Sequence, residues 1–116
     1  MPLLLTTILF VLRISWYDPS LCTTQPINCF DPTNPYTMAA GDDARDWYGR
    51  ALACPLEFPI GTRFTLSRSW HGLSDGEWLC LDRGGAVVTE SSGIVRVDLL
   101  VHEPIWNELL LALVEP

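Results

Sequence analysis

Short apolar segments separated by turn residues limit most strongly how this chain folds. Nine Pro and eight Gly are spread over 116 residues, and the apolar segments between them have the length of single strands. Because an amphipathic helix needs a periodic pattern of about ten residues or more, this punctuation favours strands. The length fits one domain of about 100–200 residues. Short strands with irregular links predict a small, mainly β barrel.

The expected strands and loops follow from where the turn residues stand. Five segments of strand length lie between turn residues: residues 48–53, 63–67, 78–81, 86–89 and 94–101. Residues 18–35 are predicted to form one long ordered loop, because prolines interrupt any helix or sheet ladder there. Short helices are compatible only with residues 42–48 and 105–113. The second of these ends in an all-apolar run, residues 109–114, which fits a fully buried closing strand equally well.

The first twelve residues are nearly all apolar and are followed by Arg13. A secretory signal has a basic segment before its apolar run and small residues at the cleavage site, and this sequence has neither. The run is also shorter than the roughly 20 residues that span a bilayer, so we expect no stable membrane span. Two interpretations stay open for residues 1–13: an apolar first strand continuing into Ile14 and Trp16, or the relic of a signal or anchor. Residues 14–116 are expected to form one barrel domain.

Charge excludes several classes of function. The chain carries 14 acidic residues against seven arginines, contains no lysine, and has a formal net charge of -7. Without lysine, Schiff-base chemistry, a catalytic lysine and a phosphate-binding P-loop are excluded. Binding to nucleic acid or anionic lipid needs a basic surface, which this composition disfavours. The apolar content of 48% with five Trp is enough for a core, so we expect a monomer that folds without metal or cofactor.

Four cysteines bear on the cellular compartment. Their spacing includes no Cys-x2-Cys pair, which argues against a zinc site. The even number permits three pairings. We favour a loop staple between Cys22 and Cys29 and a core crosslink between Cys54 and Cys80; free buried thiols are the alternative. Oxidised pairs would place the protein outside the cytoplasm.

Four sets of residues carry motifs of one family. Ser15-Trp16-Tyr17 resembles an opening Thr-x-Tyr strand, residues 37–41 (Thr-Met-Ala-Ala-Gly) resemble a Thr-Ala-Ser-Gly segment, and residues 58–64 (Phe-Pro-Ile-Gly-Thr-Arg-Phe) resemble an Ile-Pro-Leu-Gly-Thr-x-Val turn. Residues 81–87 and 97–99 resemble an Asp-x-Gly-Gly-Ala-Ile and Ile-Asp-Leu pair. Together they resemble the 3D domain, whose double-psi β-barrel group includes rare lipoprotein A, the core of membrane-bound lytic transglycosylase A and the expansins. The resemblance implies a six-stranded barrel with a long N-terminal loop and at most two short helices.

The chain departs from the family pattern in two places. The first aspartate of the family, in an Ala-Val-Asp-Pro segment, falls on Cys54 in this sequence. The interval between Asp82 and Asp98 is several residues longer than in the family, and residues 90–93 form the expected extra turn. The relative placement of the two carboxylates is therefore not set by the resemblance.

Asp98 and Asp82 are the candidate catalytic residues. Asp98 lies in an otherwise apolar strand, where desolvation raises the pKa of a carboxyl group and suits it to donate a proton near neutral pH. Asp82 precedes a Gly-Gly turn, whose backbone amides can keep it ionised. Two carboxyls in unlike environments are typical of glycoside cleavage. The resemblance implies that Asp98 protonates the glycosidic oxygen and then takes a proton from the sugar's own hydroxyl, leaving an anhydro sugar. It also places Ser15 near the acid.

Structural roles compete with these assignments. An aspartate beside Arg83 or Arg96 can form a salt bridge at the barrel rim, and Asp before Gly is a common turn former. His71 and His102 show no carboxylate pattern or metal spacing, so both are expected to be ordinary surface or strand-end residues. Sugar contacts are expected from aromatic rings and from motif residues: Trp16, Tyr17, Thr37, Trp70, Gly84 and Gly85, with Trp106 as a further ring.

Two functions remain open at this level. The first is an extracellular or cell-envelope enzyme that cuts peptidoglycan glycan strands by the lytic transglycosylase route, or loosens them as expansins do. The second is a non-catalytic barrel that binds carbohydrate or serves as a structural module of an envelope or a phage particle. In both, the expected partner is a polysaccharide.

Overall fold

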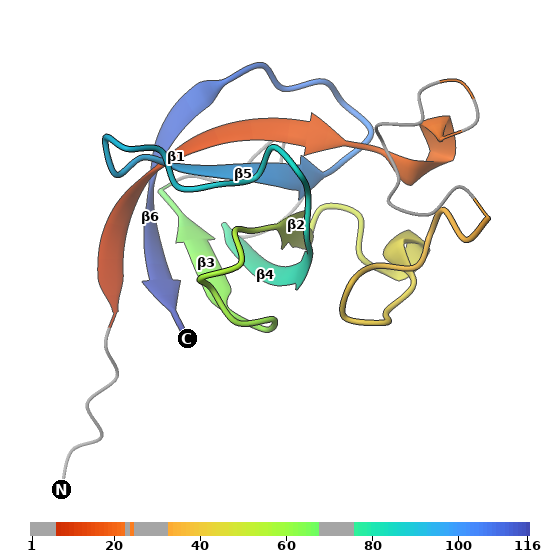
Figure 1. Ribbon diagram of the computed structural model, residues 1–116, viewed down its shortest axis with the longest axis horizontal. Coiled ribbons are helices and arrows are strands. Elements are labelled where there is room, and N and C mark those ends of the chain that lie inside the picture. The colour runs from red at the N-terminus through yellow and green to blue at the C-terminus, as the bar shows by residue number, and fades with distance from the viewer. Residues whose placement is uncertain (1–6, 23, 25–32, 68–75) are drawn as a thin grey trace, which may run out of the picture.

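Six strands form a closed barrel in the computed structural model (Figure 1), which describes residues 7–22, 24, 33–67 and 76–116. The neighbours around the barrel follow the order β1-β5-β2-β4-β3-β6. Two 3-10 turns, η1 and η3, complete the described elements, and the prediction of a small, mainly β barrel is confirmed. The bounds are β1 (Ile8–Tyr17), η1 (Pro19–Leu21), η3 (Ala44–Asp46), β2 (Ala51–Ala53), β3 (Arg63–Leu66), β4 (Glu77–Asp82), β5 (Val95–Leu100) and β6 (Glu108–Glu115).

Two pairs of strands are parallel in a barrel that is otherwise antiparallel. Strand β1 runs parallel to β5, and β2 runs parallel to β4, whereas β6 pairs antiparallel with both β1 and β3. Parallel neighbours cannot be joined by a tight hairpin, so the connections must cross the ends of the barrel. This topology differs from an up-and-down barrel, in which each strand pairs with the next along the chain. It also brings the outward side chains of β1 and β5 together in register.

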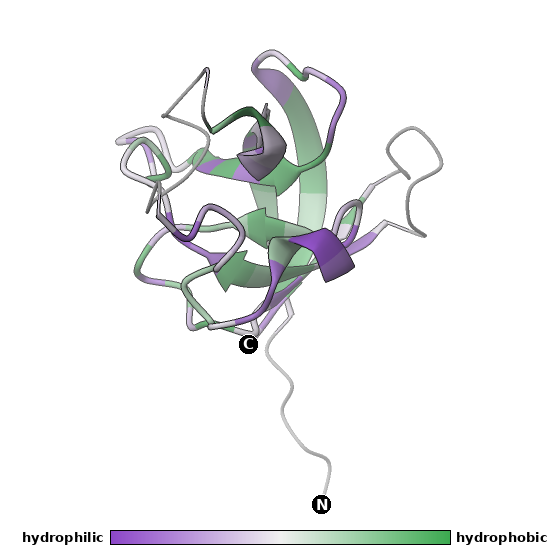
Figure 2. Cartoon of the chain, turned by 90° about the vertical axis from the view of Figure 1, so that its right-hand side faces the viewer, coloured by the Kyte–Doolittle hydropathy of each residue, from purple (hydrophilic) through white to green (hydrophobic). Residues whose placement is uncertain are grey.

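Apolar side chains fill the inside of the barrel and also cover part of its outside. Alternation along each strand sends Ile14, Val97 and Leu99 into the main core, which also holds the fully buried Trp78. A second apolar cluster contains Leu100, which follows Leu99 and therefore lies on the opposite, outer face of β5. Figure 2 shows the contrast between hydrophobic strands and more polar loops. Of β5, this outer cluster contains only Leu100, so it does not include the outward side chains earlier in the strand.

Three segments differ from the expected elements. Residues 86–89 form a turn instead of a strand, because they fold back on β5 through one bridge between Thr89 and Val95. Residues 42–48 form only the short η3 turn. Residues 105–113 are not helical, and the closing strand β6 begins at Glu108. It is not fully buried either: Leu109, Leu111 and Leu113 are about half exposed, because β6 turns only one face toward the core.

The apolar segment at the start of the chain enters the barrel as β1. Ile8 pairs with Val114 of β6, so the strand interpretation holds from Ile8 onward, and residues 1–6 lie outside the described residues. The outward side chains Leu9 and Val11 are exposed, so this strand is buried on one face only. Within the described ranges no helix has the length and apolar character needed to cross a membrane.

A disulfide joins Cys54, directly after β2, to Cys80 in β4. Both residues are buried in the main core, so the predicted core crosslink is confirmed and the free-thiol alternative is wrong for this pair. Cys22 is also disulfide-bonded. Its predicted partner, Cys29, lies outside the described residues.

Candidate functional site

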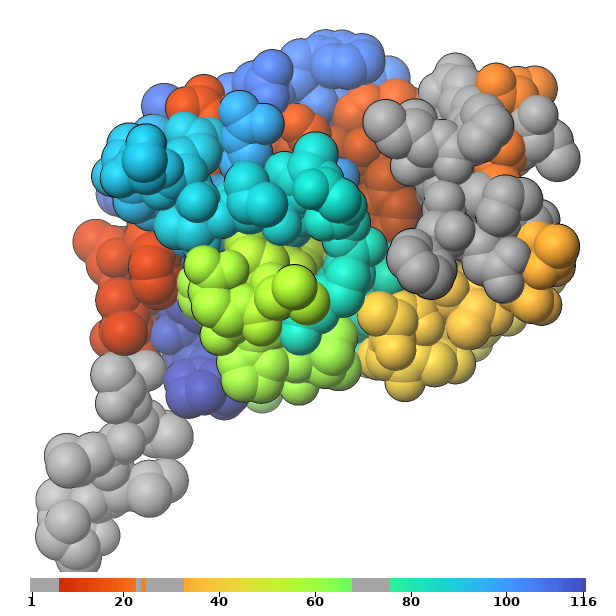
Figure 3. Space-filling model, viewed as in Figure 1, coloured from red at the N-terminus to blue at the C-terminus, as the bar shows by residue number. Residues whose placement is uncertain are grey.

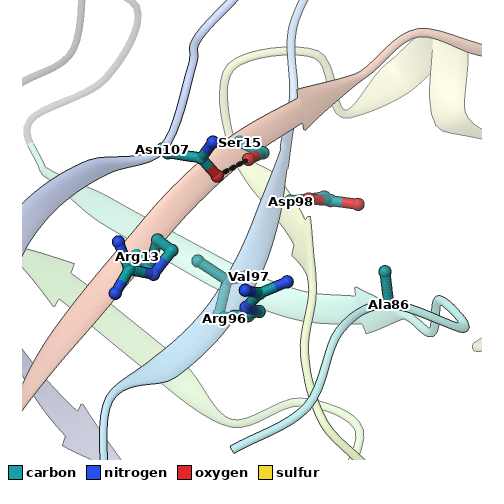
Figure 4. Close-up of a pocket in the computed structure, with 7 residues that line it drawn as sticks. All are labelled: Arg13, Ser15, Ala86, Arg96, Val97, Asp98 and Asn107. Atoms are coloured by element: carbon teal, nitrogen blue, oxygen red, sulfur yellow. Dashed lines mark hydrogen bonds between the residues drawn. The ribbon is translucent and has the colours of Figure 1, made fainter. Parts of the chain in front are cut away.

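Outward polar side chains of β1 and β5 meet at one place on the barrel surface. The parallel register pairs Arg13 with Arg96 and Ser15 with Asp98. Because Ile14 and Val97 point into the core, these four residues point outward together. They line a small cavity of about 60 Å³ (Figure 4), which we call the Asp98 pocket; its lining comprises Arg13, Ser15, Ala86, Arg96, Val97, Asp98 and Asn107.

Asp98 is a partly buried carboxyl that the described residues leave unpaired. None of them donates a hydrogen bond to it, and burial raises its pKa to about 6, with the charge of Arg96 acting in the opposite direction. The raised pKa agrees with the apolar strand in which Asp98 stands. An acid with a pKa near 6 has both its protonated and its ionised form populated near neutral pH, which suits proton transfer in either direction.

An acidic side chain from the extra turn pairs with both described arginines that lie beside Asp98. Glu90 Oε2 lies 2.7 Å from Arg13 Nε and 2.8 Å from Arg96 Nε. The hydrogen bonds from Arg13 and then Arg96 hold the pKa of Glu90 at about 2. Residues 83–94, cyan in Figure 3, lie across this face of the molecule. The salt bridge that Arg96 could form with Asp98 is thus formed with Glu90 instead.

Ser15 and Asn107 form the opposite side of the pocket. Ser15 Oγ donates a hydrogen bond of 3.4 Å to Asn107 Oδ1. Asn107 has a φ of 52°, a left-handed conformation that asparagine tolerates better than most residues. The neighbouring Trp106 is 72% exposed. Its ring lies edge-to-face on Trp16, with 6.3 Å between centroids, so an aromatic surface stands beside the pocket.

Asp82 lies near the site but is fully engaged in structural hydrogen bonds. Its Oδ1 accepts from the backbone amides of Ala39 at 3.0 Å and Arg83 at 2.9 Å, and its Oδ2 accepts from the Tyr17 hydroxyl at 2.9 Å. Burial, followed by the charge of Asp82, raises the pKa of Tyr17 well above its ordinary value. Asp82 is itself buried. These contacts indicate a role in positioning Tyr17 and the 37–41 segment.

The two aspartates stand on either side of β2. Ala53 pairs with Asp98 on β5 and with Asp82 on β4, so their backbones are separated by two strand spacings, about 9.6 Å. Asp82 does not line the Asp98 pocket. The salt bridge considered for Arg83 is absent, because Arg83 Nη1 donates to the carbonyl oxygens of Cys54 and Pro55. Cys54 is buried in the disulfide.

The residues expected to contact a sugar do not all lie at the Asp98 pocket. A Cβ on Gly84 would lie 4.0 Å from Asp98 Oδ2, so Gly84 lies close to the acid, and a Cβ on Gly85 would meet open space. Trp16 packs against the main core and the Tyr17 hydroxyl donates to Asp82, while both side chains stay partly exposed. Thr37 is exposed on its loop and does not line the pocket, while Trp70 lies outside the described residues.

His102 is exposed just beyond the end of β5, the kind of position expected from the sequence, and it also pairs with a buried carboxylate. Its Nδ1 lies 2.8 Å from Asp18 Oδ2, and its ring stacks on Tyr48 with centroids 3.9 Å apart. Asp18 is 3% exposed and also accepts from the Tyr48 hydroxyl and from Ser20. The pair joins residues 84 positions apart in the chain, which sequence spacing could not reveal. His71 lies outside the described residues.

Replacing Asp18 with Asn should destabilise the protein at neutral pH by about 2 kcal/mol, because hydrogen bonds to a buried charged group are lost. Burial raises the pKa of Asp18, but the hydrogen bonds from Tyr48, Ser20 and His102 outweigh it and lower the pKa. The stabilisation is therefore present above the ordinary pKa and is lost as the pH falls through the folded value. Urea unfolding at pH 7 measures the stability loss in Asp18→Asn, and unfolding at pH 3 measures how much of the stabilisation by Asp18 is lost in acid. Asp46→Asn, at an exposed carboxylate in η3, is the control; equal losses in both variants would contradict the role of Asp18.

The sequence did not point to Arg13 and Asn107 as pocket residues, nor to Glu90 as the partner of Arg13 and Arg96. Arg13 and Arg96 could have been found, because a polar residue at every second position of an apolar strand marks an outward face. Glu90 and Asn107 carry no such signal, since each reaches the site from a turn. No group of three His, Cys, Asp or Glu residues that could hold a metal ion occurs in the described part of the chain.

Comparisons with protein-family models, with curated proteins and with solved structures find no match to this chain. Its function must therefore be inferred from the chemistry of the Asp98 pocket. The pocket combines one partly buried carboxyl with a raised pKa, a hydroxyl and amide pair, and two arginines held by a glutamate, next to an exposed tryptophan.

Proposed function

We propose that this protein is a 3D-domain-like double-psi β-barrel that cuts peptidoglycan glycan strands by the lytic transglycosylase route, with Asp98 as the acid and base. The observation that carries the proposal is a partly buried carboxyl in a surface pocket, with a pKa of about 6 and no hydrogen-bond donor among the described residues. The closed six-stranded barrel with parallel pairs supports the fold assignment. The disulfides support a location outside the cytoplasm.

A single carboxyl is sufficient for this reaction. Protonated Asp98 donates its proton to the glycosidic oxygen as the bond from that oxygen to the anomeric carbon breaks. The resulting carboxylate takes the proton of the sugar's own hydroxyl, whose oxygen bonds to the anomeric carbon and closes an anhydro ring. Asp98 ends protonated and no water is consumed. Asp82 need not take part, which fits its three hydrogen bonds.

The neighbouring groups would orient the glycan for these steps. Ser15 and Asn107 present a hydroxyl and an amide at the pocket wall and can bond to sugar hydroxyls. Trp106 offers an exposed ring on which the apolar face of a sugar can stack. Gly84 leaves the approach to Asp98 free of a side chain.

A non-catalytic carbohydrate-binding or structural barrel, in an envelope or a phage particle, is the second candidate. Two observations favour it: Asp82 is committed to structural contacts, and a disulfide cysteine occupies the position of the family's first aspartate. Such a module would bind the glycan through the same face and would not depend on Asp98 as an acid.

Digestion of purified peptidoglycan in ¹⁸O-labelled water separates these candidates. Mass spectrometry of the released fragments is expected to show anhydro ends without ¹⁸O. Reducing ends that carry ¹⁸O would indicate hydrolysis and contradict the proposed reaction. Binding to the sacculi without any released fragment would identify a binding module, and loosening without bond cleavage would appear as swelling of the sacculi alone.

A further inference from the structure

We propose that the Asp98 pocket binds a free carboxylate substituent of the glycan, held by Arg96 with support from Arg13. This inference rests on the proposed function, since it assumes a glycan lying across Asp98. The cavity of about 60 Å³ has room for a few waters, which need roughly 10–15 Å³ of such space each, and is well below the roughly 150 Å³ that holds a benzene ring. It therefore admits a substituent such as a carboxylate but not a sugar ring, so the ring must lie over its mouth.

The charge of the pocket favours an anion. Arg13, Arg96 and Glu90 together carry one net positive charge, of which Asp98 offsets about half at pH 6 and most at pH 7, in a chain whose formal net charge is -7. A local positive charge in an acidic protein attracts anionic groups to that place and repels them elsewhere. The nearby carboxyl, Asp98, is partly protonated near pH 6 and so opposes an anion less than an ordinary aspartate would.

Arg96 has the donors that such a ligand requires. Its Nε donates to Glu90 at 2.8 Å, and no described residue accepts a hydrogen bond from its two terminal nitrogens. The side chain is 48% exposed. A guanidinium held at Nε presents its terminal N–H groups as a planar fork that matches the two oxygens of a carboxylate. Glu90 thus orients the arginine and leaves its outer donors available.

The register of β5 couples this contact to the proposed chemistry. Arg96 and Asp98 are two residues apart on the outward face, so their positions along the strand differ by about 6.6 Å. That distance is comparable to the size of one sugar residue. A carboxylate held by Arg96 would therefore place a nearby glycosidic oxygen over Asp98. Two sugar classes provide a carboxylate at this reach: a muramic-acid lactyl ether and a hexuronic acid.

Calorimetric titration of Asp98→Asn, which prevents turnover, tests the inference. The probes are a tetrasaccharide alternating N-acetylglucosamine and N-acetylmuramic acid with free lactyl carboxylates, its methyl ester, and tetragalacturonic acid. We expect the free acid to bind at least tenfold more tightly than the ester. Adding Arg96→Gln should remove this preference. Arg63→Gln is the matched control, because Arg63 is an exposed arginine paired with Glu77 on other strands.

Equal affinity for acid and ester, or a preference that survives Arg96→Gln, would overturn the inference. A preference for the muramic acid probe over tetragalacturonic acid, or the reverse, identifies the source of the carboxylate and supports the inference either way. The proposed function can fail independently of this inference. If Asp98→Asn prefers the carboxylate but the wild type cleaves no glycan, the carboxylate site is supported and the proposed enzymatic activity is contradicted.

Discussion

Asp98→Asn is expected to lower the release of anhydro fragments from peptidoglycan by at least 100-fold. The amide cannot donate or accept the proton that the reaction moves, and general acid–base catalysis contributes about 10²–10⁴-fold to rate. Fragment release is measured by mass spectrometry under conditions in which the wild type is linear with time. Undiminished release by the variant would refute the assignment of Asp98.

The same substitution should make the protein more stable at pH 7. The folded pKa of Asp98 is raised to about 6, above the ordinary value of an unfolded chain, so ionisation at neutral pH opposes folding. This opposition is absent below about pH 4, develops between about pH 4 and 6, and is complete above pH 6. Removing it should raise the free energy of unfolding at pH 7 by about 3 kcal/mol. The loss of activity therefore cannot be ascribed to unfolding.

Glu57→Gln provides the matched control for both measurements. Glu57 is an exposed carboxylate in the turn between β2 and β3, so its replacement should change neither fragment release nor stability beyond a few tenths of a kcal/mol. A stability gain of the same size in Glu57→Gln would assign the effect to net charge instead of to the burial of Asp98.

Removal of the Cys54–Cys80 disulfide is expected to have the largest effect on stability. The crosslink spans 26 residues, and the chain-entropy relation gives about 3.5 kcal/mol for a loop of this length. That is a large fraction of the roughly 5–15 kcal/mol that stabilises a domain. Urea unfolding of Cys54→Ala/Cys80→Ala measures the loss, and a loss below about 1 kcal/mol would contradict it.

The dependence of the unfolding free energy on urea distinguishes the crosslink from simple packing. Without the disulfide, the unfolded chain expands and exposes more surface, so the slope should increase. Loss of two buried sulfur atoms alone would lower the midpoint and leave the slope unchanged. An unchanged slope would therefore assign the destabilisation to core packing.

Much of the barrel could be predicted from local sequence, because punctuation by Pro and Gly sets strand length. Strands β2 to β5 fall within, or extend at most one residue beyond, segments that lie between turn residues in the sequence. Residues 86–89 do not form the expected strand, because a turn takes up residues 85–86 and leaves only a single bridge to β5, at Thr89. The sequence of the leucine-rich segment at residues 109–114 fits a helix and a strand equally well. It forms a strand because β1 and β3 pair with it on either side.

The site was predictable only in part. Asp98 and Ser15 were found through a resemblance and an apolar strand, and the parallel register places them side by side. The contact between Arg13 and Glu90 joins residues 77 positions apart, and it depends on how a turn folds over β5. Ion pairs between residues far apart in the chain produce no periodic sequence pattern. For the same reason the contact between Asp18 and His102 cannot be predicted from the sequence.

Titration of the Asp98 carboxyl by ¹³C NMR tests most directly the claim on which the proposed function depends. The wild type and Asp98→Asn are compared from pH 3 to 8, and the resonance missing from the variant identifies the carboxyl. The account predicts a midpoint near pH 6, since burial without a hydrogen-bond donor raises the pKa. A midpoint near pH 4 would show an ordinary surface carboxylate and would contradict the proposed acid.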